Sequence, residues 1–122
     1  MMMLSNNQIQ LEQEILGSML KESSLAINAR EKIKPEMFLY SKHMRIYLGI
    51  LEMIEEKLEI DLITFLEYHK KNINEMDGVN YVSEIFTCSA SDLAFNTKIL
   101  LLISNYKKHL YLEVMDKVNS DM

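Results

Sequence analysis

The chain has few of the residues that interrupt or cross-link a polypeptide: three glycines, one proline and one cysteine among 122 residues, and no tryptophan. So few glycines and prolines argue against an all-β fold, which needs many tight turns. Cys88 has no second cysteine to pair with, so an intramolecular disulfide is excluded and a reducing, cytoplasmic setting is expected. The glycines also do not form the Gly-x-x-x-x-Gly-Lys-Ser/Thr phosphate loop, so we expect no ATP hydrolysis by this chain.

Long hydrophobic runs are also missing. The longest apolar run, residues 99–103, is far shorter than the stretch of about 20 residues that spans a bilayer. Residues 1–5 lack the basic start and the apolar stretch of a secretory signal. We therefore expect neither secretion nor a membrane partner.

An excess of positive charge is absent too, since the formal net charge is −5. This balance argues against a general nucleic-acid-binding surface. Residues 1–97 hold nine basic and 15 acidic side chains, a net of −6, whereas residues 98–122 hold four and three, a net of +1. Lys107 and Lys108 lie close to Tyr106 and Tyr111, but two lysines on a helix usually form a solvated face. Direct binding of nucleic acid is not expected.

What the chain has in abundance is helix-forming residues, and 48% of it is hydrophobic, which is enough for a core. Apolar residues recur at helical spacing in successive segments, which predicts an all-α fold. Ser41 and Asp61 are expected N-caps. Gly17 lies inside the first predicted helix, where glycine usually indicates the close approach of another helix. The expected helices cover residues 8–20, 24–33, 41–57, 61–72, 79–86 and 93–118, with a short helical turn beginning at Pro35.

Side chains of the types that carry out chemistry are scattered along the chain. His43, His69 and His109 fall in different predicted helices and lack metal-ligand spacing, so surface or rim positions are expected for them. Cys88 is interpreted as a small residue in a turn rather than a nucleophile. The acidic run at 55–59 is interpreted as a solvated helix end. We predict no catalytic, cofactor-binding or metal-binding residue and no cofactor.

Several short motifs follow one another in a specific order. Each is weak alone, but their order and spacing are informative. They are Leu16-Gly17, Pro35-Glu36-x-Phe38, Ile60-Asp61-Leu62-x-Thr64 and Gly78-Val79-Asn80-Tyr81. In this order, over roughly residues 8–114, they resemble the N-terminal domain of DnaB-type replicative DNA helicases. The chain departs from the family pattern at Asp77, where the family often has a glycine, and at Cys88-Ser89, where a proline is common.

The resemblance implies a fold and a role. It implies a single domain over residues 1–122, with a small helical globule at 8–86 followed by a helical hairpin, or one long helix, at 93–118. In the family, two such hairpins pack together, and the dimers form a collar with trimer-of-dimers symmetry that binds primase or a helicase loader in the primosome. The domain itself is not an enzyme, whereas the parent protein would be an ATP-dependent DNA helicase.

The C-terminal segment carries the candidate oligomer interface. Residues 99–115 have apolar side chains on more than one helical face, and such a helix needs cover on several sides. A second copy of the chain would supply this cover; the alternative is that the segment folds back onto residues 8–86. The candidate interface residues are Leu100, Leu101, Leu102, Ile103, Tyr106, Leu110 and Tyr111.

Alternative functions remain open from the sequence. The helicase-binding domain of a primase resembles this fold, although the ordered motifs favour the helicase. A stand-alone regulator that binds a replicative helicase or its loader and inhibits assembly is a third possibility.

Overall fold

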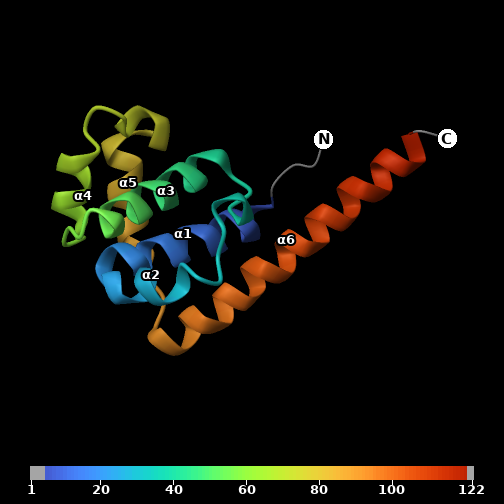
Figure 1. Cartoon of the computed structure of the whole chain (residues 1–122), viewed down its shortest axis with the longest axis horizontal. Coiled ribbons are helices and arrows are strands. Elements are labelled where there is room, and N and C mark those ends of the chain that lie inside the picture. The colour runs from blue at the N-terminus through green and yellow to red at the C-terminus, as the bar shows by residue number, and fades with distance from the viewer. Residues whose placement is uncertain (1–4, 121–122) are drawn as a thin grey trace.

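The computed structural model describes residues 5–120, apart from the side chains of residues 92 and 120, and this part of the chain is helical without strands. Helices α1 to α5 gather into a globule, and α6 extends from it as a long rod (Figure 1). The predicted all-α fold is therefore confirmed. The elements are α1 (Asn6–Lys21), α2 (Ser23–Ala29), the 3-10 helix η1 (Pro35–Met37), α3 (Ser41–Glu55), α4 (Leu62–Tyr68), the 3-10 helix η2 (Ile73–Met76), α5 (Gly78–Thr87) and α6 (Asp92–Ser120).

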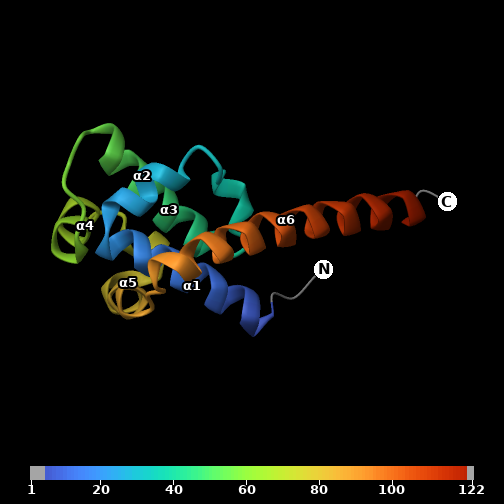
Figure 2. The ribbon, with the colours of Figure 1, turned by 90° about the horizontal axis from the view of Figure 1, so that it is seen from below.

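Helix α1 is the centre of the globule and contacts α2, α3, α5 and α6. Its side chains Ile15, Leu16, Met19 and Leu20 are completely buried. Their spacing places them on one face of the helix, as the sequence pattern predicts. Figure 2 shows α6 lying beside α1 along the first half of its length.

Helix α1 and the helix starting after Asp61 have side-chain caps. Asp61 accepts a hydrogen bond from the Thr64 backbone N–H at 2.9 Å, and the Thr64 hydroxyl accepts one from the Asp61 N–H at 2.9 Å. This capping box confirms the predicted start of α4. The prediction for Ser41 is wrong, because Tyr40 occupies the N-cap position and makes no side-chain cap bond. Helix α1 begins at Asn6, where Ser5 caps the Gln8 N–H at 3.0 Å.

Helix α2 is shorter than predicted and ends at Ala29. Lys34 has extended backbone angles and Pro35 begins the next turn. Beyond Ala29 the chain turns, and the Lys32 and Ile33 N–H groups both bind the Ala29 carbonyl oxygen, so the last residues of the predicted helix form this turn instead.

Gly17 lies where α1 passes the end of α5. A Cβ atom at this position would collide with the backbone carbonyl oxygens of Ile85 and Cys88. The neighbouring Ser18 hydroxyl accepts a hydrogen bond from the Ala90 N–H at 2.9 Å, which holds the turn after α5 on α1. The close approach that the sequence predicts at Gly17 is confirmed.

Helix α6 is continuous over Asp92–Ser120, so of the two predicted forms of this segment the structure shows one long helix and not a hairpin. No glycine or proline lies in this segment to break the helix. Near the middle of the helix, the Asn105 side chain donates a hydrogen bond to the Gln8 side-chain oxygen at 2.8 Å and holds α6 against α1.

Helix α3 ends in a left-handed turn at a residue that is not glycine. Lys57 has φ of 59°, its N–H binds the Ile54 carbonyl, and the Leu58 N–H binds the Met53 carbonyl. These two bonds form a Schellman motif, whose left-handed position favours glycine because a Cβ is strained there.

We expect Lys57→Gly to raise the free energy of unfolding by about 1 kcal/mol, because glycine removes this strain. Thermal unfolding by circular dichroism checks the change, which corresponds to a midpoint roughly 4 °C higher. Lys57→Ala is the control, since it removes the charge but keeps the Cβ. An equal gain from alanine would contradict the backbone explanation.

Candidate protein-interaction site

The first half of α6 belongs to the core of the globule. Phe95, Ile99 and Leu102 are 2%, 4% and 0% exposed, and they are spaced four and three residues apart. Through this stripe α6 packs against α1 and η1. The first half of the helix is therefore held in one place on the globule.

The second half of α6 projects beyond the globule (Figure 1). Every residue from 111 to 119 is exposed, and Tyr111 and Val114 are exposed by 65% and 59%. Apolar residues cover more than half of the circumference of this segment, and Glu113, Asp116 and Lys117 share the remaining face. The apolar residues of this uncovered segment are Leu110, Tyr111, Leu112, Val114, Met115 and Val118.

One row of residues on the outer side of α6 has the spacing of a coiled-coil seam. Leu93 and Leu100 are seven residues apart, and Tyr111, Val114 and Val118 follow one another at steps of three and four. Between Leu100 and Tyr111 the row passes through the polar residues Ser104 and Lys107. All five apolar side chains are at least 49% exposed. A second helix could cover this row along most of the length of α6.

The structure separates the predicted interface residues into three groups. Leu100, Leu101, Leu110 and Tyr111 are exposed, and Ile103 and Tyr106 are half-buried. Leu102 is completely buried in the chain's own core, so it does not lie on the exposed surface where the sequence analysis placed it. Four exposed apolar residues beyond Tyr111 were not among the candidates, although their helical spacing is visible in the sequence. They are Leu112, Val114, Met115 and Val118.

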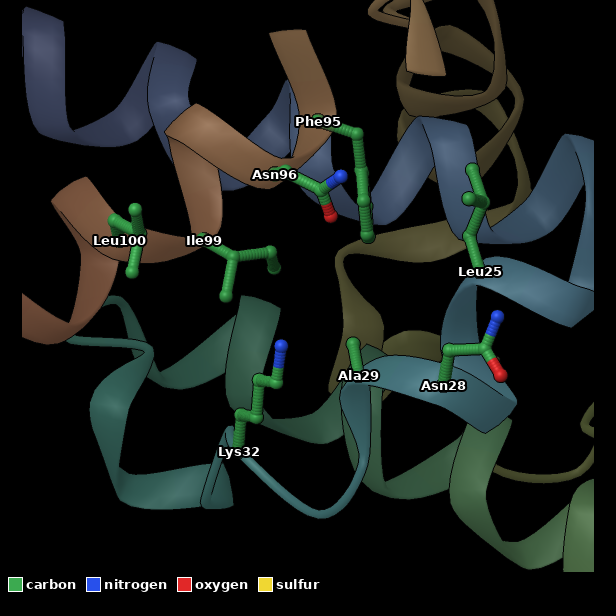
Figure 3. Close-up of a pocket in the computed structure, with 8 residues that line it drawn as sticks. All are labelled: Leu25, Asn28, Ala29, Lys32, Phe95, Asn96, Ile99 and Leu100. Carbon is green, nitrogen blue, oxygen red and sulfur yellow. The ribbon is translucent and has the colours of Figure 1, made fainter. Parts of the chain in front are cut away.

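A groove of about 330 Å³ lies between α2 and the first half of α6 (Figure 3). Ala29, Phe95 and Ile99 give it apolar walls, and Leu100 connects it to the outer row of α6. The groove therefore extends the exposed apolar surface of α6 onto the globule. Its other lining residues are Leu25, Asn28, Lys32 and Asn96.

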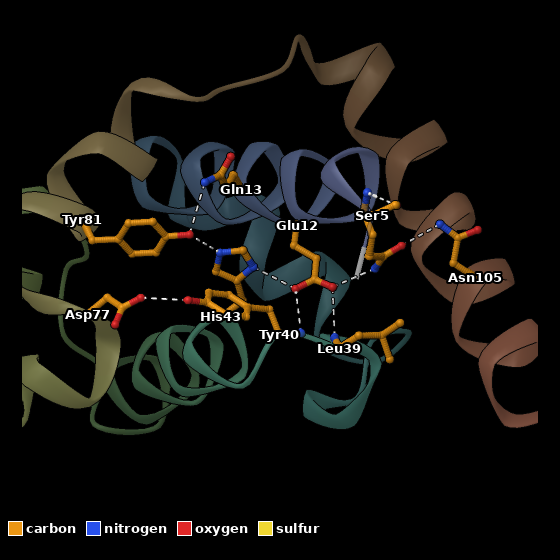
Figure 4. A network of polar contacts seen from close by, with 10 residues as sticks. Ser5, Glu12, Gln13, Leu39, Tyr40, His43, Asp77, Tyr81 and Asn105 are labelled. Atoms are coloured by element: carbon orange, nitrogen blue, oxygen red, sulfur yellow. Dashed lines mark hydrogen bonds and ion pairs between the residues drawn. The ribbon is translucent and has the colours of Figure 1, made fainter. Parts of the chain in front are cut away.

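A buried polar network fixes the position of α6 relative to the globule (Figure 4). Glu12 is completely buried, and its Oε2 accepts hydrogen bonds from the Gln8 amide at 2.7 Å and the Leu39 N–H at 2.9 Å. Its Oε1 accepts bonds from the Tyr40 N–H at 3.3 Å and from His43 Nδ1 at 2.8 Å. The Gln8 amide NH₂ and the two backbone N–H groups can only donate, and the tautomer with hydrogen on Nδ1 makes His43 the fourth donor.

His43 continues the network to α5. Since its Nδ1 donates to a carboxylate, its Nε2 can accept the Tyr81 hydroxyl hydrogen at 2.7 Å, and the Tyr81 oxygen accepts from the Gln13 amide at 3.2 Å. Burial, followed by the charges of Asp77, Glu84 and Glu12, raises the pKa of Tyr81, while the Gln13 bond opposes this shift. The neutral hydroxyl is thus the stable form, as this arrangement requires.

The expectation that the histidines occupy the surface or rim is wrong for two of them. His43 is 0% exposed and His69 is 3% exposed, and His69 Nε2 lies 3.1 Å from the Gly49 carbonyl oxygen. His109 is half-buried and contacts Glu113 at 3.1 Å. Helical spacing could have revealed that Glu12 and His43 are buried. Each of them lies three and four residues before two apolar core residues, Ile15 and Leu16 after Glu12, and Ile46 and Tyr47 after His43.

Within the described residues 5–120, no group of three or more His, Cys, Asp or Glu side chains is arranged to hold a metal ion. None of the helices described combines the length and the hydropathy needed to cross a membrane.

The arrangement of a helical globule with a long C-terminal helix agrees with the sequence comparisons. The family model of the DnaB-like helicase N-terminal domain matches residues 4–101. The chain belongs to this family. It is 30% identical over 96 residues to the replicative DNA helicase DnaB of Rhodothermus marinus, and this match covers 75% of this chain and 10% of that protein. It is 28% identical over 79 residues to the replicative DNA helicase DnaB of Geobacillus stearothermophilus, and this match covers 63% of this chain and 17% of that protein.

Solved structures show the same fold. The N-terminal domain of DnaB helicase from Mycobacterium tuberculosis matches with a TM-score of 0.84 and 17% identity, over 92% of this chain and 83% of that one. A DnaB-like replicative helicase, solved to describe its interactions with primase, matches with a TM-score of 0.76 and 21% identity, over 93% of this chain and 27% of that one. The chain therefore corresponds to a small part of the whole helicases.

Proposed function

We propose that this chain is a non-catalytic assembly and docking domain of a replicative DNA helicase. Residues 8–86 form the globule, and residues 93–118 form the segment through which copies of the chain associate. The copies form dimers and, as the family resemblance implies, a collar of three dimers. The observation that carries the proposal is the uncovered apolar segment of α6 at residues 110–118.

Physical reasoning favours a helical partner for this segment. A helix of about 12 residues is marginal in water when no tertiary packing supports it. The segment extends beyond the contacts of the globule, so packing against another helix would supply the missing support. The seam-like row through Leu100, Tyr111 and Val114 fits a second copy of α6.

A docking role for primase or a helicase loader is the second part of the proposal. It is supported by the fold, which matches a DnaB-like helicase solved with regard to its interactions with primase. The globule also has exposed surface at α3, α4 and α5 that α6 does not cover, and this surface remains available after assembly. A primase helicase-binding domain is less well supported, since the family model is that of the helicase.

The double variant Tyr111→Asp/Val114→Asp is expected to be monomeric where the unchanged chain is a dimer or larger. Two carboxylates in the middle of an apolar helix contact would be buried without partners. The free-energy cost of removing them from water outweighs the association free energy. Light scattering over a range of concentrations measures the mass, and circular dichroism checks that the globule remains helical.

Asn119→Asp is the matched control, because it adds a carboxylate to the same exposed end of α6 without removing an apolar side chain. It should leave the mass unchanged. A chain that is monomeric at every concentration, or a double variant with unchanged mass, would overturn the assembly proposal. Leu102→Asp is unsuitable for this test, since it places a charge in the core.

A further inference from the structure

A second exposed apolar surface lies where α3 is connected to α4. It is a shallow hollow of about 340 Å³, which we name the α3–α4 hollow. Its lining is mainly apolar, with Met53 at 1% exposure and Leu58 and Tyr68 at 42% and 41%. The complete lining is Met53, Leu58, Glu59, Thr64, Glu67 and Tyr68.

The polar group of Thr64 is already engaged within the chain. Its hydroxyl donates to the Glu59 carbonyl oxygen at 3.0 Å and accepts from the Asp61 N–H at 2.9 Å. The walls therefore offer contact area from Leu58 and Tyr68 rather than hydrogen bonds. Such a site suits an apolar side chain of a partner, surrounded by polar contacts at the rim.

The lining of the hollow holds two carboxylates, Glu59 and Glu67, and it lies within an acidic stretch of the chain. Residues 52–67 contain six carboxylates and one lysine, a net charge of −5, which equals the formal net charge of the whole chain. Partial desolvation, followed by the charges of Glu52 and Glu56, raises the pKa of the Tyr68 hydroxyl. Lys57 is the one basic residue in this range, and Lys70 just beyond it is paired with Glu67 at 2.9 Å.

The position of the hollow leaves it accessible in an assembly through α6. Helix α4 lies at the end of the globule opposite the free end of α6 (Figure 1). The hollow shares no residue with the exposed rows of α6. A partner bound at the hollow would therefore not compete with a second copy bound along α6.

We propose that the α3–α4 hollow docks a basic amphipathic segment of a partner protein. One apolar side chain of that segment inserts between Leu58 and Tyr68, and its lysines or arginines face Glu59 and the neighbouring carboxylates. Charge complementarity selects this partner and sets its orientation. Nucleic acids and anionic membranes carry charge of the same sign as the rim and are repelled. This inference rests on the docking part of the proposed function but not on the assembly part.

The probe is a short synthetic helical peptide of leucine and lysine with leucines at i, i+3, i+4 and i+7, added to the full chain. We expect amide chemical shifts to change at residues 53–68. Leu58→Ser should weaken binding, measured by fluorescence anisotropy, about tenfold, because the inserted side chain loses its apolar contact. Glu59→Gln should weaken binding about threefold and reduce its dependence on salt.

Matched controls separate this site from general attraction to an acidic protein. A leucine and glutamate peptide of the same pattern should not bind. Ile63→Ser changes an exposed residue of α4 outside the lining, and Glu36→Gln removes a distant carboxylate; both should leave the affinity within about twofold, since neither contributes to the site.

Shift changes confined to α6, or Leu58→Ser binding as tightly as the unchanged chain, would overturn the inference. The mass of the chain is measured in the same samples. A loss of assembly in Leu58→Ser would identify the hollow as a contact between copies and would also overturn it. Normal assembly without peptide binding would defeat this inference and leave the assembly part of the proposed function intact.

Discussion

Gly17→Ala is expected to destabilise the chain by about 3 kcal/mol, despite the higher helix propensity of alanine. The added Cβ would meet the carbonyl oxygens of Ile85 and Cys88, which belong to the backbone at the end of α5 and cannot rotate away. Helix α5 and the turn after it must move from α1 as a unit, which disrupts packing at the centre of the globule. Thermal unfolding should show a midpoint lower by roughly 10–15 °C.

Gly49→Ala provides the control for this result. Gly49 is also buried inside a helix, but a Cβ there would meet the side-chain ends of His69 and Met76 at 3.0 Å. Met76 can rotate and the buried His69 ring need shift by only a few tenths of an ångström, so this substitution should cost about 1 kcal/mol, clearly less than Gly17→Ala. Equal losses at Gly17 and Gly49 would show that the contact with α5 is not what makes Gly17 necessary.

Gly17 also shows what helical sequence patterns can predict. A glycine on the apolar face of α1 indicates that another segment approaches closely, and this prediction is confirmed. The pattern does not identify the segment, because Ile85 and Cys88 are 68 and 71 residues further along the chain. Contacts of this kind depend on how helices assemble, which a local periodicity does not encode.

The C-terminal helix shows a different limit. The apolar run at 100–102 indicates that α6 needs cover on more than one side, but it does not tell which leucine faces the globule. The structure buries Leu102 completely and leaves Leu101 48% exposed. The direction of the stripe is set by Phe95 and Ile99, which are buried where α6 packs against the globule, and adjacent residues point about 100° apart.

The polar network was the part of the site that the sequence analysis missed. Polar residues at single positions are usually solvated, so a pattern treats them as surface. Glu12 and His43 are instead on the buried faces of α1 and α3, where each satisfies the other and the carboxylate also binds backbone N–H groups. The two residues are 31 positions apart, and their pairing becomes visible once the helices are placed together.

Glu12→Gln is expected to lower the free energy of unfolding by about 3 kcal/mol, although glutamine has nearly the same shape as glutamate. The two carboxylate oxygens bind different backbone donors, Oε2 the Leu39 N–H and Oε1 the Tyr40 N–H. A glutamine has one oxygen and one NH₂ group, so either orientation places an NH₂ against a backbone N–H that is left without an acceptor.

Glu14→Gln on the same helix is the matched control. Glu14 pairs with Lys98 at 2.9 Å where both side chains are about a quarter exposed, so its loss should cost less than about 1 kcal/mol. Chemical denaturation of both variants measures the difference. Because the network also reaches Asn105 through Gln8, hydrogen exchange in Glu12→Gln should quicken in the first half of α6 as well as in α1. Equal stability of the two variants would mean that the carboxylate does not hold the loop before α3, and that packing alone positions α6 on the globule.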